Sequence, residues 1–512
     1  MWTRRCAVFT GLYTQGTKAK PVARTIRAMP PHPSSFLHRP RLRHCAAACL
    51  LALATLGSQA ATALPDTPPL PTSWSQASSA TPDSLAQWWD KFNDAQLSAL
   101  VTQALQANPS LRKAEAALQQ ARALRDAKQG ALLPSLNASG SGQRSQTNEQ
   151  AATNSFKAGL DASWEPDLFG GKRQALNATE ADAQAQQATL ADAQVSLAAE
   201  VALAYLQLRG QQSQLAIAQT NLASQQETLQ LTDWRAQAGL TTSLEVEQAR
   251  TAVEQTRAEI PTLQANMAAS QHSLAVLTGQ APTALTEQLT AAAPIPGAPE
   301  QLALAFPADT LRQRPDVRAE EARIAAALAR VQVADAARYP SFSISGSLGL
   351  SALTLAGLTN GASVLSSLLA SVSMPVFDGG ATAANLRAQE AALVQAQASY
   401  QSTVLTALQE VEDALAALRG HRARLQHLQN AATAAELAAL LAQQRYASGL
   451  IDFQTVLTTQ RTLLSAQNNV ASTRTDLGTD HVRLYKALGG GWQTIPAVPT
   501  TSTASPLSAG QP

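Results

Sequence analysis

The sequence predicts an α+β membrane protein in which short strands form a β-barrel shared between chains, continued by long coiled-coil helices. Three observations predict this fold. Motifs recur in two copies of one unit, short stretches in each copy alternate apolar and small polar residues, and a long proline-free stretch follows them. The first observation indicates an internal duplication, the second indicates β-strands, and the third indicates long helices.

The N-terminal segment 1–63 is predicted to be a secretory signal peptide. The basic stretch RPRLRH at 39–44 precedes the apolar run CAAACLLALATLG, and small residues at 58–63 offer a cleavage site. Because this leader is unusually long, Met29 is an alternative start, and a buried N-terminal helix is the alternative structure. The following residues, 64–90, are predicted to be extended.

All three cysteines of the chain, Cys6, Cys45 and Cys49, lie in this leader. The mature protein is therefore predicted to contain no disulfide. Cys49 closes the stretch AAAC and is a weak candidate for lipidation. It precedes the apolar core of the leader instead of following it, so we expect cleavage near Ala60 or Ala63 and no lipid.

The charge distribution argues against a nucleic-acid partner. The chain carries 38 Lys and Arg against 36 Asp and Glu, but nine of the bases lie in 1–63, which contains no acid. The rest of the chain is therefore acidic overall and lacks the basic face that nucleic acid requires. No later stretch approaches the length of apolar sequence that a transmembrane helix needs.

Two segments of the chain resemble each other at a near-constant offset. NPSLRKAEAALQQAR, which begins at 108, aligns with RPDVRAEEARIAAAL, which begins at 314, and LRG recurs at 208–210 and 418–420. Each copy is predicted to contain a helix, two strands, a long helix and a shorter helix. The predicted organisation is repeat 1 at 91–290, a Pro/Ala-rich linker at 291–308, repeat 2 at 309–490 and a disordered tail at 491–512.

Two strands are predicted in each repeat, within about 134–166 and about 340–375. SFSISGSLGL, which begins at 341, alternates with a period of two. The first copy alternates in the same way, in SLNASGSG and GLDASW, with less apolar bulk. In the second copy we expect one face to carry Phe342, Ile344, Leu348 and Leu350 and the other to carry Ser343, Ser345, Ser347 and Gly349.

Apolar residues recur every seven positions in the long proline-free stretches, beginning at Val201 and Leu208 in the first copy and at Val411 and Leu418 in the second. A helix of this length, at about 1.5 Å per residue, extends for roughly 100 Å. Such a seam must pack against other helices. On the helices alone, a plain coiled-coil rod is an alternative. The predicted helices span about 171–239, 241–279, 380–449 and 451–488.

The strands favour a membrane barrel over that rod. One apolar face and one Ser/Gly face suit a wall between lipid and water. Strands of about 9–11 residues span a bilayer only within a closed barrel, because lipid satisfies no unpaired backbone group. Single-chain barrels start at about 8 strands, and this chain supplies four. The barrel must therefore be shared: two chains would give eight strands and three would give twelve.

The two copies share a strand-ending motif, PDLFGG in the first and PVFDGG in the second. Proline removes a donor from the sheet, and Gly-Gly lets the chain turn without a Cβ penalty. We therefore predict that these motifs form the turns from strand to long helix. The turn residues are Pro166, Gly170, Gly171, Pro375, Gly379 and Gly380.

The sequence resembles the TolC/OprM-type outer-membrane efflux proteins, the outer-membrane factors of RND-type efflux systems. The resemblance rests on WWDKFNDAQLSALVTQALQANPSLRKAEA, LRQRPDVRAEEARIAAA, MPVFDGG and QRYASGLIDFQTVLTTQRTLLSAQ, and it covers about 88–492. It implies a homotrimer, with a twelve-stranded barrel in the outer membrane and a twelve-helix tunnel in the periplasm. It also implies three partners, namely a periplasmic adaptor, an inner-membrane RND-type pump and outer-membrane lipid.

The resemblance places functional sites at the hairpin tips, where members of the family meet the adaptor. It implies adaptor contacts at Arg235, Gly239, Leu240, Gly449 and Leu450. The family carries one or two Asp in a constriction just beyond the second tip, in a pattern such as DVLDAQR, and this chain reads TVLTTQR there. We assign the constriction to Thr455, Thr458, Glu245 and Glu247, and the packing of the gate to Arg445, Tyr446 and Asp452.

No catalytic, cofactor-binding or metal site is predicted. His421 and His427 are six residues apart, so they point to different faces of a helix, and no Cys follows the leader. The favoured function is passive export of small molecules through the outer-membrane channel of a tripartite efflux pump. One alternative is the outer-membrane duct of a type I protein secretion system. An alternative from a different class is a coiled-coil surface protein without a pore.

Overall fold

The computed structural model describes residues 85–146, 151–297, 311, 313–360 and 362–492. The chain divides into two units, 1–64 and 65–512, and all of the described residues belong to the second. The predicted leader, with Met29 and Cys49, therefore lies outside the described residues. The expectation of an extended segment over 64–90 is wrong at its end, where Trp88–Phe92 forms a 3-10 helix, η1, because its aromatic side chains enter the core.

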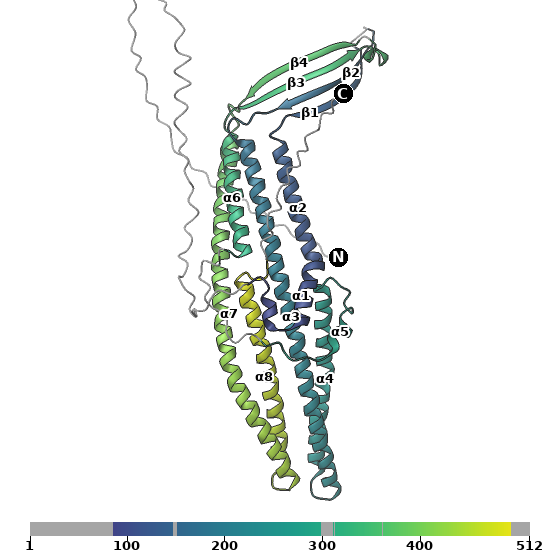
Figure 1. The fold of residues 1–512 in the computed structure, drawn as a ribbon, viewed down its shortest axis with the longest axis vertical. Helices are drawn as coiled ribbons and strands as arrows, with labels where there is room; N and C mark the ends of the chain where they lie inside the picture. The colour runs from purple at the N-terminus through teal and green to yellow at the C-terminus, as the bar shows by residue number, and fades with distance from the viewer. Residues whose placement is uncertain (1–84, 147–150, 298–310, 312, 361, 493–512) are drawn as a thin grey trace, which may run out of the picture. The chain divides into compact units, whose positions relative to one another are not determined.

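Helices make up most of this unit, and one antiparallel sheet lies at one end of them (Figure 1). After η1 the order is α1 (Ala95–Ala107), α2 (Pro109–Gly130), β1 (Ser135–Ser145), β2 (Thr153–Trp164), α3 (Gly171–Gln237), α4 (Ser243–Leu277), α5 (Thr286–Thr290), α6 (Pro315–Ala336), β3 (Ser341–Ala352), η3 (Ala356–Leu358), β4 (Ser363–Ser373), α7 (Ala381–Ala447) and α8 (Phe453–Ala487).

The predicted internal duplication is confirmed by matched element lengths. The helices before the sheet, α2 and α6, each have 22 residues. The long helices α3 and α7 each have 67 residues, and the helices that follow them, α4 and α8, each have 35. Each repeat therefore contains the same unit, with two strands between a 22-residue helix and the long helix.

The four strands form one sheet in the order β1-β2-β3-β4, and every neighbouring pair is antiparallel. Leu348 lies opposite Leu160, and Leu350 opposite Val364, so apolar side chains share one face. On the other face serine hydroxyls meet, as in Ser343 with Ser371 at 2.6 Å. The predicted alternation of β3 therefore holds across the sheet, with Leu365 and Leu369 as apolar residues on the hydroxyl face.

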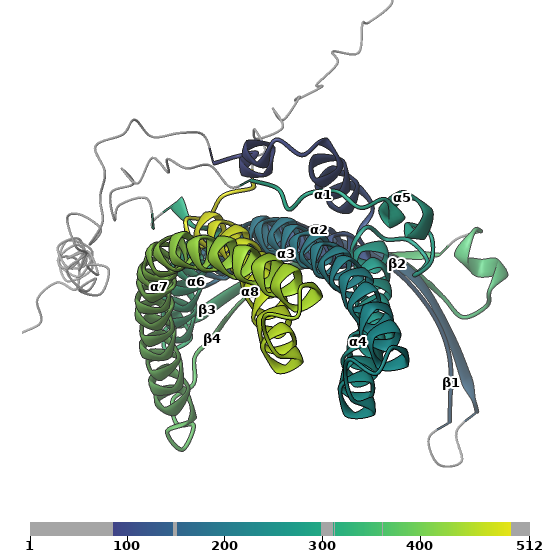
Figure 2. The same ribbon diagram turned by 90° about the horizontal axis from the view of Figure 1, so that it is seen from below.

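The helices form a curved layer, with α1 and α5 on its convex side (Figure 2). The two long helices run from the sheet to the far tips. α3 packs against α2 and α6 near the sheet and against α4 and α8 toward the tips, while α7 packs against α6 and then α8. α7 thus lies at one edge of the layer, and α2 and α4 lie at the other.

The shorter helices are stacked end to end by equivalent residues of the two repeats. Asn108, before α2, donates its side-chain amide to the carbonyl oxygen of Leu277 at the end of α4, at 2.8 Å. Arg314, before α6, donates Nη1 to the carbonyl oxygen of Ala487 at the end of α8, at 2.6 Å. A carbonyl that the helix end would leave unpaired is thereby satisfied in each repeat.

The main core lies where these helix ends meet. Trp88 of η1 stacks on Tyr485 of α8 with ring centroids 5.3 Å apart. Leu97 and Leu206 are fully buried in the same cluster. This core holds α1 and the C-terminal ends of α4 and α8 against the middle of α3. Within the described ranges, no helix is both long enough and apolar enough to cross a membrane.

Candidate functional site

The ends of the long helices are the surfaces to which the sequence assigned function. α3 ends in a left-handed Gly239, at φ 71°, and the amide of Leu240 donates to the carbonyl oxygen of Arg235 at 2.8 Å. α7 ends in the same way, with Gly449 at φ 75° and the amide of Leu450 donating to Arg445 at 2.9 Å. The glycine amides also donate, Gly239 to the carbonyl oxygen of Ala236 at 3.0 Å and Gly449 to that of Tyr446 at 2.9 Å. Both helices thus end in a Schellman motif, and a hydrophobic residue follows each glycine.

The tips carry exposed apolar side chains above a small core. Leu240 is 69% exposed and Leu450 is 73% exposed, so in a single chain both project from the turns. Below them the two hairpins share a buried cluster that includes Tyr446, Phe453 and Val456 from the second hairpin and Ala249 from the first. The tips are therefore joined to each other by packing and are also able to contact a partner.

A polar network crosses between the hairpins beside that cluster. Tyr446 of α7 donates its phenol to Glu245 Oε2 of α4 at 3.2 Å, and Thr241 also donates to that carboxylate. Arg235 of α3 lies over the Tyr446 ring, 4.7 Å from its centroid, and donates to its carbonyl oxygen at 2.5 Å. These contacts hold the second hairpin against the first.

The structure separates the two predicted acids of the constriction. Glu245 is half-buried between the hairpins and accepts the hydrogen bonds described above. Glu247 is exposed and pairs with Arg250, one turn later in α4, at 2.7 Å. Within one chain both carboxylates are therefore engaged, Glu245 across the hairpins and Glu247 along its own helix.

The predicted residues of the second tip make mostly local contacts. Asp452 caps α8, and hydrogen bonds from the Thr455 hydroxyl, at 2.5 Å, and the Thr455 amide, at 2.9 Å, lower the pKa of the Asp452 carboxyl. Thr458 donates to the carbonyl oxygen of Gln454 at 2.8 Å. The side chain of Arg445 is exposed, and it is Arg235 that packs on Tyr446. The expected packing role of Arg445 is therefore not seen within one chain.

Two further cross-hairpin bonds were not anticipated. Gln460 of α8 donates to the Thr228 hydroxyl of α3 at 2.9 Å, and both side chains are buried. Asn221 of α3 donates to Gln467 Oε1 of α8 at 2.8 Å. Polar residues at heptad positions of α3 and α8 could have indicated such bonds. The sequence could not pair them, because the partners lie more than two hundred positions apart.

The strand-to-helix turns form at the predicted motifs. Gly170 (φ 79°), Gly379 (φ 64°) and Gly380 (φ 88°) are left-handed, which explains glycine at these positions.

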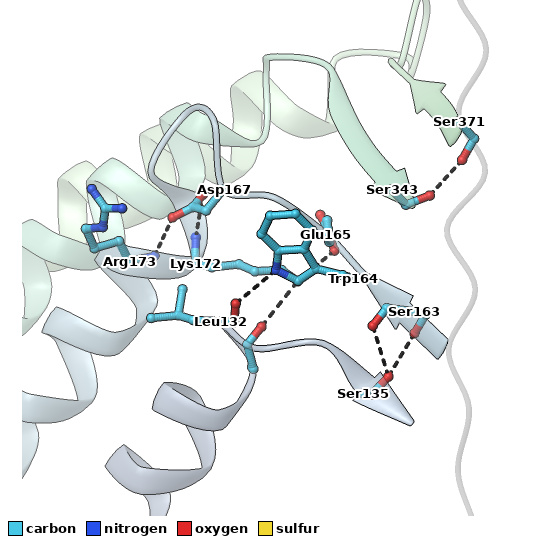
Figure 3. A network of polar contacts seen from close by, with 11 residues as sticks. Leu132, Ser135, Ser163, Trp164, Glu165, Asp167, Lys172, Arg173, Ser343 and Ser371 are labelled. Carbon is cyan, nitrogen blue, oxygen red and sulfur yellow. Dashed lines mark hydrogen bonds and ion pairs between the residues drawn. The ribbon is translucent and has the colours of Figure 1, made fainter. Parts of the chain in front are cut away.

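The carboxylate of Asp167 accepts the amides of Lys172, at 3.2 Å, and Arg173, at 2.7 Å (Figure 3). In the second copy, Asp378 accepts the amides of Gly380 and Thr382. These aspartates, which the sequence analysis missed, satisfy amides at the start of each long helix. Pro166 and Pro375 stand between the last strand residue and these turns.

Comparison with known proteins places this architecture in a family. The model of the family "Outer membrane efflux protein" matches residues 100–280 and 306–490. The chain is 34% identical to the outer membrane protein OprJ of Pseudomonas aeruginosa, over 87% of this chain and 95% of that protein. It is 33% identical to the toluene efflux pump outer membrane protein TtgF of Pseudomonas putida, over 83% of this chain and 89% of that protein. The solved structure of the outer-membrane channel OprN superposes with a TM-score of 0.76 at 36% identity, over 83% of this chain and 98% of that one. The chain belongs to the outer membrane efflux protein family.

Proposed function

We propose that three copies of this chain assemble into the outer-membrane channel of a tripartite efflux pump. One observation carries the proposal: the chain has a four-stranded sheet with two unpaired edges, β1 and β4, and one apolar face. In lipid those edges must be paired, so the sheet has to continue into the sheets of neighbouring chains. This requirement also argues against a coiled-coil protein without a pore.

The channel function favours three chains over two. A barrel of about 8 strands is filled by its own side chains. Two chains would therefore leave no lumen, whereas three chains would supply twelve strands. The hydroxyl face, with its serines, would then line the water-filled interior, and the apolar face would meet lipid.

The helical layer supports the same assembly. α7, at one edge of the layer, exposes Val394, Leu405 and Leu437, and α2, at the other edge, exposes Leu124. Large exposed apolar residues along both edges indicate contact with further subunits. Joining α7 of one chain to α2 and α4 of the next would extend the curved layer into a closed periplasmic tunnel.

The tips are the gate of this tunnel. Glu245, Tyr446 and Arg235 hold the hairpins together in the closed state, and Thr455, Thr458 and Glu247 lie at the constriction. The exposed Leu240 and Leu450, beside Gly239 and Gly449, form the contact surface for a periplasmic adaptor. Adaptor and RND-type pump binding would open the gate by separating the second hairpin from the first. Transport through the channel is passive, and the energy comes from the pump.

The cargo we propose is a small organic molecule, since the relative TtgF is named for toluene efflux. The test is to express the full-length chain in an efflux-deficient bacterium together with a matching adaptor and pump. The expected result is a heat-modifiable trimer in the outer-membrane fraction and restored resistance to organic solvents or drugs. A monomer outside the membrane would contradict the channel, and secretion of a protein substrate without drug resistance would favour the type I duct.

A further inference from the structure

A cavity of about 400 Å³ lies at the sheet–helix junction of the first repeat. Its walls come from the end of β2, the turn into α3, the end of α6, the start of β3 and the end of β4. Three rings form one wall: Phe169 stacks on Tyr339 with centroids 4.9 Å apart and on Phe342 with centroids 6.4 Å apart. Phe169 and Tyr339 are both about half exposed, so a ligand at the junction can contact both rings.

The aromatic wall of the cavity continues the apolar face of the sheet, while Ser341 and Ser373 of the hydroxyl face also line the cavity. Phe342 lies opposite Val372 and one alternation from Ile344, which lies opposite Trp164, so these side chains share the apolar face. Each strand has 11 or 12 residues, about the length needed to cross the bilayer. The ends of the strands, and with them this cavity, therefore lie at the level of the periplasmic headgroups. The cavity extends from the ends of the two central strands to the end of β4, where Ser373 and Pro375 line it.

Two opposite charges border the rings. Lys172 Nζ lies 3.0 Å from Glu165 Oε2 and 3.4 Å from the carbonyl oxygen of Ala131 (Figure 3). The side chains are 30% and 47% exposed, so both remain accessible to a ligand. The Lys172 ammonium and the Glu165 carboxylate can bind the opposite charges of a zwitterionic lipid headgroup. The aromatic wall beside them can contact the acyl chains of the same lipid.

The second repeat lacks these charges. Met374, just before Pro375, stands where Glu165 precedes Pro166, and Ala381, just after Gly380, stands where Lys172 follows Gly171. The shared proline and Gly-Gly of the turn motif make this a comparison at matched positions. The charged pair is therefore specific to one junction and is not required for the strand-to-helix turn itself.

We propose that this cavity binds a phosphatidylethanolamine-type phospholipid of the periplasmic leaflet. Lys172 binds the lipid phosphate, Glu165 accepts hydrogen bonds from the lipid ammonium, and the rings of Phe169, Tyr339 and Phe342 pack against the glycerol and the first acyl carbons. The inference rests on the proposed position of the sheet in the membrane. Three sites per trimer follow, one for each chain.

The test is native mass spectrometry of the full-length trimer, delipidated in detergent and titrated with phosphatidylethanolamine or phosphatidylglycerol. We expect up to three tightly bound phosphatidylethanolamine molecules per trimer and weaker binding of phosphatidylglycerol, which lacks the ammonium. Lys172→Gln should weaken both lipids by about tenfold, the effect of one charge-assisted contact. Glu165→Gln should weaken only phosphatidylethanolamine and so remove the preference.

Arg387→Gln is the matched control, because Arg387 is an exposed base near the start of α7, at the other junction. It should leave both affinities unchanged. Equal binding of the two lipids, or a preference that survives both Lys172→Gln and Glu165→Gln, would overturn the proposal. The same spectra report the trimer mass, so loss of the trimer in the unmodified protein would instead contradict the proposed function.

Discussion

The phenol of Tyr446, near the end of α7, donates a hydrogen bond to Oε2 of Glu245, near the start of α4, at 3.2 Å. These residues belong to different repeats and lie 201 positions apart in the sequence. The bond joins the two hairpins beside the proposed constriction. Because α7 and α8 can separate from α3 and α4 only if this bond breaks, its removal should favour the open gate.

We therefore expect Tyr446→Phe to raise the conductance of the trimer in planar-bilayer recordings. The ring would still pack on Phe453, but Glu245 would lose a donor, which destabilises the closed tips by roughly 1 kcal/mol per chain, or about fivefold in the closed-to-open ratio. Tyr400→Phe is the control, since Tyr400 donates to Glu321 at 3.4 Å in the upper half of the helices. An equal effect of both variants would show that the tip contact is not the gate.

The constriction should respond only weakly to cations in the unmodified protein. Thr455 and Thr458 supply hydroxyls where an acidic ring would attract multivalent ions, and both hydroxyls already donate to neighbours in α8 or its cap. Thr455→Asp with Thr458→Asp should create block by millimolar divalent or trivalent cations on the periplasmic side, measured in bilayer recordings. Strong block of the unmodified channel that survives Glu245→Gln and Glu247→Gln would place the constriction elsewhere.

The long helices could be read from the sequence because their signals are local. Heptads, bounding glycines and the absence of proline predicted 171–239 and 380–449, and the structure has Gly171–Gln237 and Ala381–Ala447. The sheet was equally readable, since a period of two places Ile344 and Leu348 on one face. Both patterns report the environment of one element, which is what periodicity can encode.

The tip network could not be read in the same way. Arg235 was assigned to the adaptor surface, and its stacking on Tyr446 depends on how two hairpins from different repeats meet. Asp167 and Asp378 cap the equivalent helices α3 and α7. They occupy different positions of the turn motif, so aligning the two repeats did not reveal their shared role. An aspartate just before a glycine-initiated helix was the available local signal.

The facing of the barrel can be tested with one pair of variants. Leu348→Arg places a charge on the apolar face near the middle of β3 and should cost roughly 2–4 kcal/mol per chain at the bilayer midplane. We expect it to abolish the heat-modifiable trimer in outer-membrane fractions. Ser345→Arg places the same charge on the hydroxyl face and should be tolerated. If Ser345→Arg proves the more damaging change, lipid and water are on the opposite faces from those proposed.

A buried histidine should make the helical layer sensitive to acid. His481 of α8 is fully buried, and neither ring nitrogen has a hydrogen-bond partner within the part of the chain that the structure describes. Burial, with a smaller contribution from the nearby Arg422 guanidinium, lowers the pKa of His481 to about 4. The neighbouring Asp480 carboxylate contacts His421 at 2.5 Å and Arg483 at 3.4 Å, and it makes no hydrogen bond to His481.

Between pH values of about 6.5 and about 4 the unfolded chain binds a proton at this histidine and the folded chain does not. Stability should therefore be constant above pH ~6.5 and fall as the pH decreases through this window, by an amount on the order of 3 kcal/mol per chain. His481→Leu keeps an apolar group of similar size and should flatten this part of the dependence of the melting temperature on pH. His272→Leu, at an exposed histidine of α4, is the control for the loss of any histidine. An unchanged acid slope in His481→Leu, measured by thermal denaturation of the trimer between pH ~5 and ~8, would mean that His481 is protonated in the folded protein.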